Sequence, residues 1–351
     1  MTADRPLRTA DFEYHLPPEL IAQTPGAERG GSRLLMVRRA DAAEQQAGQE
    51  DLQFSDLPGL IPAGDLLVLN STRVRHARLL GTRPSGAPAE VLLIHPATDG
   101  SWIAIGKPGS ALRAGKRIAL GPGAEIETLE VLPDGERRVR FVGMPAEEAI
   151  ARFGRLPLPP YIAHEPTVLD EDRYQTVYAE REGSVAAPTA GLHFTDALLA
   201  SLRGRGVHIA ALDLEVGPGT FKPVEEDDIS AHPMHPERFD IPAAVATAVR
   251  EARARGAAVW AVGTTVVRAL ESAAGPDGTV APGAAETRLL IAPGYRFRVV
   301  DRLVTNFHLP RSTLLMLVAA FAGYDTTMAA YRHAVAARYR FYSYGDAMCI
   351  L

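Results

Sequence analysis

The 351-residue chain has a single cysteine, Cys349, and only three lysines among its 37 basic residues. One cysteine excludes an internal disulfide framework and a cysteine-based zinc site, which fits a reducing compartment. The most apolar run, residues 314–321, is far too short to cross a bilayer. The polar stretch 1–9 does not resemble a signal peptide. We therefore expect a cytoplasmic protein without a membrane segment.

The sequence also lacks a strong excess of charge of either sign. Its net charge is −5 at pH 7 and its pI is about 6.1, so an RNA partner would need a local basic patch. The segment after residue 70 offers one, because Arg73, Arg75 and Arg78 follow one another closely. These arginines can contact phosphates, or they can form an ordinary solvated strand edge.

Familiar nucleotide-binding loops are missing. No segment has the spacing of a P-loop. Glu215 precedes Gly217 and Gly219 after an expected strand, as in the first motif of Rossmann methyltransferases, but Phe221 and Pro223 stand where that motif needs a small residue and a helix. The two glycines still permit a ligand to approach closely. An S-adenosylmethionine-dependent RNA methyltransferase is one alternative function.

Metal motifs are equally sparse, and the chain has no His-Glu-x-x-His pattern. His232 and His235 precede Glu237 at a spacing that zinc could use. However, Pro233 and Pro236 break any helix that would align the two imidazoles. We expect no metal, and a polar substrate contact or an acid/base role for these histidines. A zinc hydrolase is a further alternative, and so is a purely structural loop.

Two patterns of secondary structure divide the chain. Between residues 71 and 154, short apolar runs recur about every ten residues between Gly, Pro and Asp, which is typical of a small antiparallel β-barrel. Elsewhere helices and strands alternate, which is typical of an α/β fold. We predict an α/β domain made discontinuously of residues 1–70 and 155–351, with a β-barrel domain, residues 71–154, inserted. Expected helices are 196–203, 243–255, 266–272, 312–322 and 328–339; expected strands include 65–70, 207–216, 258–262, 288–291 and 297–300.

Polar residues gather just before expected helices. Thr189 and His193 lie among small residues ahead of a helix that Thr195 can cap. Thr264 and Thr265 follow an expected strand and open another helix. Backbone N–H groups at such helix starts favour an anion, although a packed loop histidine and an ordinary capped helix would produce the same patterns.

Arg268 and Glu271 are three residues apart, so they can pair on one helix face. A third polar loop precedes the helix that Ser312 caps, and it can stack on and hydrogen-bond a nucleobase. Its polar and aromatic members are Asn306, Phe307, His308 and Arg311. The C-terminal stretch 339–348 is aromatic and carries one acid, Asp346, so we expect it to fold into the core or the site.

Eight segments, in one order, closely resemble the S-adenosylmethionine:tRNA ribosyltransferase-isomerase family of queuosine biosynthesis. They are residues 11–17, 64–74, 183–195, 216–224, 262–272, 293–295, 305–316 and 340–348. The chain departs from the family at Glu215, where a histidine is usual, and at 284–286, where a glycine usually precedes Thr287. We therefore assign no role to Glu215 or Thr287.

The resemblance implies that S-adenosylmethionine is a co-substrate that donates its ribosyl group rather than its methyl group. The implied acceptor is the aminomethyl group of a 7-deazaguanine at the wobble position of a tRNA, and the implied products are epoxyqueuosine-tRNA, adenine and methionine. It also implies a discontinuous α/β domain with a β-barrel. We expect a monomer without an obligate protein partner. A non-catalytic RNA-binding protein is the alternative from another class.

Such a reaction needs a base for the ribose C5′ proton beside the sulfonium and an acid for the departing adenine. Within the matching motifs the candidate catalytic residues are His193, His308, Glu271 and Asp346. The candidate cofactor-binding residues are Thr189, Gly217, Gly219, Thr264, Thr265 and Arg268. The candidate substrate- or tRNA-binding residues are Arg73, Arg75, Arg78, His232, His235, Asn306, Phe307 and Arg311.

Overall fold

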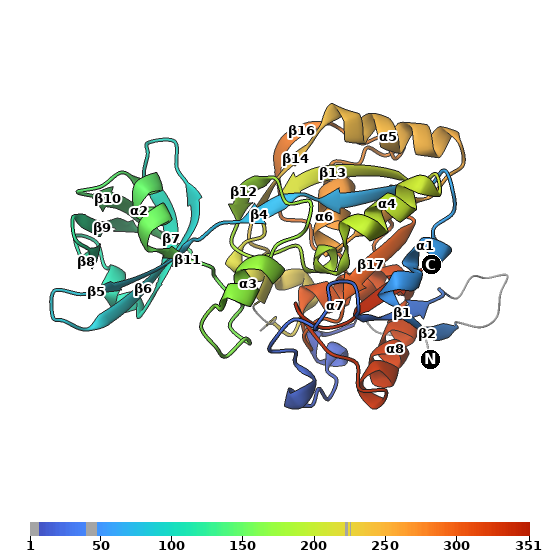
Figure 1. Cartoon of the computed structure of the whole chain (residues 1–351), viewed down its shortest axis with the longest axis horizontal. Coiled ribbons are helices and arrows are strands. Elements are labelled where there is room, and N and C mark those ends of the chain that lie inside the picture. Colours follow the sequence, from blue (N-terminus) through green and yellow to red (C-terminus); the bar gives the residue numbers. More distant parts are fainter. Residues whose placement is uncertain (1–6, 40–47, 222–223, 225) are drawn as a thin grey trace.

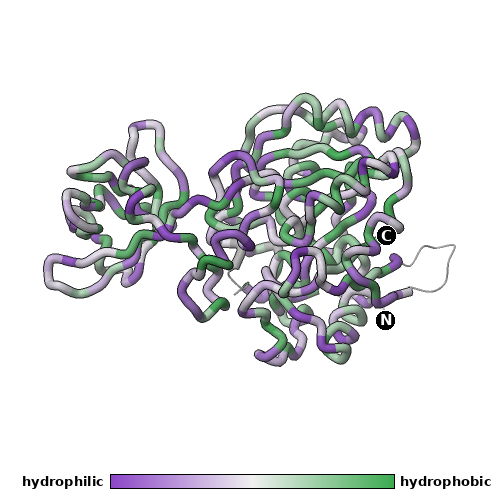
Figure 2. Tube along the Cα trace, in the orientation of Figure 1, coloured by the Kyte–Doolittle hydropathy of each residue, from purple (hydrophilic) through white to green (hydrophobic). Residues whose placement is uncertain are grey.

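The computed structural model describes residues 7–39, 48–221, 224 and 226–351. The expectations drawn for residues 1–6 and for Pro223 lie outside these ranges. Figure 1 shows a larger body of helices and strands, with a smaller, mostly β body beside it. Hydrophobic stretches run through the middle of the larger body, and hydrophilic stretches occupy many of its peripheral loops (Figure 2).

The larger body is built on a nine-stranded sheet. Its four central strands, β13, β3, β15 and β17, run parallel to one another. In spatial order the strands are β16 (Gly283–Thr287), β14 (Glu237–Ile241), β13 (His208–Leu214), β3 (Leu66–Asn70), β15 (Val259–Val262), β17 (Arg302–Asn306), β18 (Ala347–Ile350), β1 (Arg33–Val37) and β2 (Gln49–Gln53).

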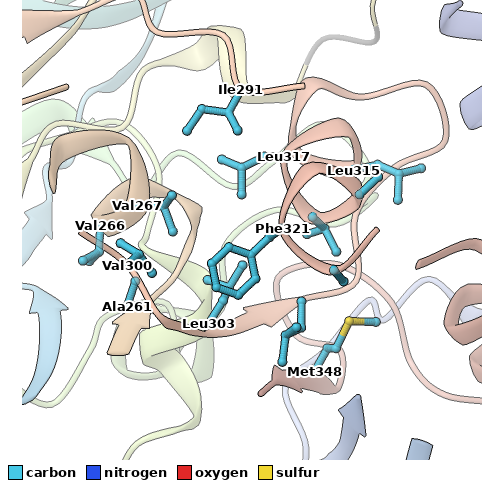
Figure 3. Packing of buried hydrophobic residues seen from close by; sticks show 14 of the residues in the cluster. Ala261, Val266, Val267, Ile291, Val300, Leu303, Leu315, Leu317, Phe321 and Met348 are labelled. Atoms are coloured by element: carbon cyan, nitrogen blue, oxygen red, sulfur yellow. The ribbon is translucent and has the colours of Figure 1, made fainter. Parts of the chain in front are cut away.

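Both faces of this sheet are covered. Along β3, Leu66 and Val68 belong to one hydrophobic cluster and Leu67 and Leu69 to another, as the two-residue period of a strand requires. The first face carries α5 (Ala243–Ala254), α6 (Thr264–Ser272), α7 (Thr313–Ala322) and α8 (Tyr324–Ala336). The second face carries α1 (Leu57–Leu60) and α4 (Asp196–Gly204). Figure 3 shows the first cluster, in which Phe321 lies near Val267 and Leu303.

The smaller body is a seven-stranded sheet in which every pairing is antiparallel. Its order is β11 (Gly154–Arg155), β5 (Arg78–Thr82), β6 (Pro88–Pro96), β7 (Trp102–Lys107), β10 (Arg137–Val142), β9 (Ala124–Val131) and β8 (Arg117–Gly121). Thr82 of β5 also pairs with Ala119 of β8. These strands and α2 (Ala146–Phe153) enclose their own hydrophobic cluster.

A short parallel pair, β4 (Thr72–Val74) and β12 (Arg181–Ser184), and the helix α3 (Val168–Arg173) complete the α-helices and β-strands of the described residues. No single helix in the described ranges is long and apolar enough to span a membrane. The helices α7 and α8 reach that length and composition only together, and they are bent by 116° where they meet.

Two expected strands are wrong. Residues 288–291 and 297–300 form loops, and the nearest strand is β16, at 283–287. The reason in the second case is a carboxylate: Glu271 accepts the backbone N–H groups of Arg298, Val299 and Val300 at 2.9–3.0 Å. A buried side chain therefore satisfies donors that a neighbouring strand would otherwise bind.

Candidate active site

The order in which the chain visits the parallel strands reverses between β3 and β15. The chain leaves β3 for β13 on one side and returns to β15 on the other. In open α/β sheets ligands bind beyond the carboxyl ends of the strands at such a switch point. The carboxyl ends of β15 and β17 border a cleft at this place, which we call the inner cleft.

Segments far apart in the sequence line the inner cleft. They are the short helix Thr189–His193, the start of α6, the loop after β17, and side chains near residues 161 and 343. The polar residues among them are Tyr161, Thr189, Thr264, Thr265, Thr305, Asn306, His308, Ser312, Tyr342 and Ser343. The lining contains no carboxylate and no arginine among the described residues. It brings together six predicted site residues: Thr189, Thr264, Thr265, Asn306, Phe307 and His308.

The amino end of α6 opens into the inner cleft. Gly263 precedes the helix with a φ of +94°, a conformation that suits glycine, and no side chain caps the helix. The first helical bond there is the one that the N–H of Val267 donates to Gly263. The N–H groups before it therefore have no partner within the helix. Thr265 Oγ1 is buried without a hydrogen-bond partner, so this end of α6 suits an anionic ligand group.

His308 is the one imidazole in the described lining of the inner cleft. Its main chain is fixed at both ends, because its N–H donates to the Tyr331 hydroxyl at 2.9 Å and its carbonyl accepts from the Tyr14 hydroxyl at 2.5 Å. Nε2 lies 2.8 Å from Thr305 Oγ1. Burial lowers the pKa of His308 to about 3, so the ring is neutral at pH 7.

His193 stands directly behind the inner cleft. Asn306 Nδ2 donates to the Tyr342 carbonyl at 3.0 Å, which fixes the orientation of the amide, and it also lies 3.2 Å from His193 Nε2. The Nε2 atom must therefore accept, so the proton is on Nδ1, which donates to Ser32 Oγ at 2.7 Å. The ring stacks on Phe54 at 4.9 Å. Burial lowers the pKa of His193 to about 4.

This arrangement leaves Asn306 Oδ1 buried without a partner. Asn306 is only 2% exposed, so an unsatisfied oxygen costs free energy unless a ligand donates to it. Tyr342, whose carbonyl fixes the amide, has a φ of 71°, which is uncommon outside glycine. Both features indicate that the loop is built around a ligand rather than around its own packing.

Asp346 lies in a neighbouring hollow that also contains His193. Its carboxylate is nearly buried and accepts the backbone N–H groups of Arg33 and Arg340 at 2.9 and 2.8 Å. Burial raises the pKa of Asp346. The carboxylate thus joins β1 to the C-terminal segment and does not line the inner cleft.

Glu271 and Arg268 lie away from the inner cleft, and they do not form the ion pair that their spacing allows. Arg268 pairs instead with Glu237 of β14, and its Nε donates to the Leu289 carbonyl at 3.2 Å. Glu271 accepts three backbone N–H groups and the Tyr295 hydroxyl. Both side chains are buried in these contacts. Their geometry is structural, and we do not place either of them in the chemistry.

Phe307 is fully buried and packs edge-on against Tyr331 and Tyr339, so its ring is part of the core rather than a surface for a base. Arg311 adopts a φ of 57° and its backbone N–H donates to the Phe12 carbonyl. Its side chain does not line the inner cleft. Of this predicted loop, Asn306 and His308 are the members whose polar side chains face the cleft region.

The three arginines near β4 and β5 are already engaged. Arg78 forms a two-pronged contact with Glu165 and a 3.0 Å pair with Glu90. Arg73 donates to the Ala179 carbonyl, and Arg75 lies 5.0 Å from the centre of the Trp102 ring. Contact of these arginines with tRNA stays a prediction.

The remaining candidates lie outside the inner cleft. Gly217 borders a separate hollow beside Glu215. A Cβ on Gly219 would lie 2.6 Å from the His235 ring, so that glycine makes room for the histidine. A short 3₁₀ turn, Pro218–Phe221, follows rather than the long helix of a Rossmann motif. His232 pairs with Glu226 at 2.7 Å, and the described residues contain no group of three or more potential metal ligands.

Sequence reasoning missed Ser32, Phe54, Tyr161 and Ser343. Ser32 and Phe54 contact His193, and the Tyr161 hydroxyl lies 2.5 Å from Ser343 Oγ in the lining. Only Ser343 belongs to a segment that carried the family resemblance. The others are 139 to 182 positions away from the residues they contact, so no local pattern marks them.

Comparison with known proteins decides the family. The sequence profile described as "Queuosine biosynthesis protein" matches residues 9–350. The chain belongs to this queuosine biosynthesis family. A protein of Dechloromonas aromatica named S-adenosylmethionine:tRNA ribosyltransferase-isomerase is 52% identical over 347 residues, covering 98% of this chain and 97% of the relative. One of Anaeromyxobacter with the same name is 51% identical, with 98% and 99% covered.

A solved structure agrees with this assignment. The S-adenosylmethionine tRNA ribosyltransferase of Thermotoga maritima is 36% identical, with a TM-score of 0.55, and the match covers 97% of this chain and all of that one. The queuosine biosynthesis family resemblance expected from the sequence motifs is thereby confirmed, as is the mixed α/β architecture.

Proposed function

We propose that this chain transfers the ribosyl group of S-adenosylmethionine to the aminomethyl group of a 7-deazaguanine at the tRNA wobble position and isomerises it. The products are epoxyqueuosine-tRNA, adenine and methionine. Full-length relatives at about 50% identity that bear the ribosyltransferase-isomerase name support the activity. The observation that carries the location is the inner cleft, in which buried polar atoms of Thr265 and Asn306 lack partners.

The methionine end of the donor fits the amino end of α6. Its carboxylate would accept hydrogen bonds from the N–H groups that have no partner within the helix and from the Thr265 hydroxyl. We leave Arg268 out of this role because it pairs with Glu237. Asn306 Oδ1 is an acceptor, so it needs a hydrogen-bond donor from the ligand, such as a ribose hydroxyl or an amine N–H.

His308 is the residue we assign to removing the C5′ proton beside the sulfonium. It is neutral at pH 7 because burial lowers its pKa to about 3, and it is the one imidazole in the described lining. A neutral ring accepts a proton but does not supply one. The donors available to the departing adenine are therefore hydroxyls, among them Tyr161, whose pKa burial raises to about 12.

His193 supports this site from behind. Its proton is fixed on Nδ1 by Ser32 and its Nε2 holds the amide of Asn306. We assign it a positioning role, because it acts on the inner cleft through Asn306.

The smaller body supports a second part of the proposal. We propose that residues 71–154 form an inserted domain that closes as a small β-barrel, and that residues 1–70 and 155–351 form the catalytic domain. The separate hydrophobic cluster of the smaller body and the Thr82–Ala119 pairing of β5 with β8 support this division.

The test of the activity follows both halves of the donor. The protein is incubated with tRNA carrying the aminomethyl precursor and with S-adenosylmethionine labelled in the ribose. The proposal predicts label in the RNA and one free adenine for each label transferred. Methylated RNA with S-adenosylhomocysteine, or tRNA binding without turnover, would contradict it.

A further inference from the structure

A second hollow lies beside the inner cleft and is lined by four arginines, Arg33, Arg173, Arg338 and Arg340. We call it the arginine pocket. Its walls are the loop 25–32, which contains three glycines, and the C-terminal segment 338–346. The acidic side chains in its lining are Glu28 and Asp346. The lining therefore has an excess of positive charge, whereas the whole chain carries −5.

Two of these arginines, Arg173 and Arg340, are not held in place by ion pairs. Arg173 donates to the Gly26 carbonyl and Arg340 to the Thr24 carbonyl, and neither forms an ion pair with a described acidic residue within 4.0 Å. Arg338 lies 4.0 Å from Glu19 and is largely exposed, with a φ of 54°. Arg33 lies 3.5 Å from Asp51. Placing Arg173 and Arg340 around one hollow without an ion pair for either costs energy unless an anion compensates their charge.

The arginine pocket communicates with the inner cleft. Ser343 lines both hollows, and His193, which lines the arginine pocket, contacts Asn306 of the inner cleft at 3.2 Å. A polymer held in the arginine pocket can therefore place one of its residues against the inner cleft. A single carboxylate would engage one arginine fork, whereas four guanidinium groups fit several phosphates.

We propose that the arginine pocket binds the phosphate backbone of the tRNA beside the nucleotide that is modified. This inference rests on the proposed function and adds to it the place where the acceptor enters. The arginines hold phosphates, and the base next to them reaches the inner cleft past Ser343. A competing source of the same negative charge is the methionine carboxylate of the donor, which the test separates from phosphate.

The test compares Arg173→Gln, Arg340→Gln and the double variant with Arg250→Gln. Arg250 is an exposed arginine on α5, outside both hollows, and serves as the matched charge control. Affinity for an unmodified tRNA transcript is measured by fluorescence anisotropy at several salt concentrations. Affinity for S-adenosylmethionine is measured by calorimetry, and thermal unfolding verifies the fold.

Each pocket substitution should weaken tRNA binding on the order of fivefold to tenfold and lower the salt slope by about 0.7–0.9, the value of one lost phosphate contact. Arg250→Gln should change neither. If the substitutions only loosened the loop 25–32, the unfolding temperature would fall and the salt slope of tRNA binding would stay unchanged. That result would overturn the proposal. Weaker donor binding with unchanged tRNA affinity would overturn it in favour of a carboxylate site. Turnover of wild-type protein is assayed separately, so a failure of the activity is distinguished from a failure of the pocket.

Discussion

Asn306 Nδ2 lies 3.2 Å from His193 Nε2 and 3.0 Å from the Tyr342 carbonyl, and it can only donate to both. One amide thereby sets the tautomer of a buried histidine and leaves its own oxygen free for a ligand. Asn306 and His193 are 113 positions apart, and their contact connects the inner cleft to the arginine pocket.

Asn306→Asp tests this relationship. A carboxylate cannot donate, so His193 should move its proton to Nε2 and its pKa should rise toward the ordinary value. Nitrogen shifts of labelled histidine report the tautomer. We expect the single-turnover rate to fall about 10- to 100-fold through lost positioning. A changed tautomer with an unchanged rate would show that His193 and Asn306 do not position the reaction.

Thr265→Val separates a ligand-binding hydroxyl from a structural one. Its Oγ1 is buried without a partner, so an isosteric methyl should leave the free energy of unfolding unchanged or raise it. Affinity for S-adenosylmethionine should fall by about 1–3 kcal/mol. Thr176 has the same kind of unpaired hydroxyl outside the inner cleft. Thr176→Val should therefore leave donor binding unchanged, and equal effects of the two variants would refute the assignment.

The buried histidines predict a loss of stability in mild acid. The pKa of His308 is about 3 in the folded state and about 6.5 in the unfolded chain. Above about pH 6.5 the neutral His308 causes no loss of folding stability. The free energy of unfolding decreases as the pH falls below about 6.5, because the unfolded state then binds a proton that the folded state does not. Between pH 7 and pH 5 the loss is about 2 kcal/mol. Denaturant unfolding of His308→Gln should show a pH dependence weaker by that amount; parallel curves for the two proteins would contradict the buried, neutral ring.

Glu271→Gln tests whether this candidate is structural. The two carboxylate oxygens of Glu271 accept from three backbone N–H groups and from one hydroxyl. The glutamine amide would have only one acceptor oxygen for these four donors. We expect a loss of about 1–3 kcal/mol in the free energy of unfolding, with the single-turnover rate of the folded protein unchanged. A rate loss of 100-fold or more in well-folded protein would return Glu271 to the catalytic residues.

Local signals predicted much of this structure. Thr195 and Ser312 cap α4 and α7 by accepting from Leu198 and Leu315, as their positions before apolar helices indicate. The all-buried strand β3 was visible as an apolar run. These features depend on neighbours within a few residues, so the sequence carries them.

Contacts between distant residues could not be predicted in this way. Arg268 stands three residues from Glu271, yet it pairs with Glu237 on another strand. The 297–300 segment looks like a strand, but a helix carboxylate binds its N–H groups. Ser32 fixes His193 from 161 residues away. In each case tertiary packing, not local preference, selects the partner.

The most direct test of the central claim is single-turnover adenine release by His308→Gln, with precursor tRNA and S-adenosylmethionine saturating. His208→Gln, an exposed histidine on β13, is the control. If the inner cleft is where the donor reacts, His308→Gln should lose about 10²–10⁴-fold in rate, with tRNA and donor affinities kept, and His208→Gln should match wild type. Wild-type adenine release by His308→Gln would contradict the account.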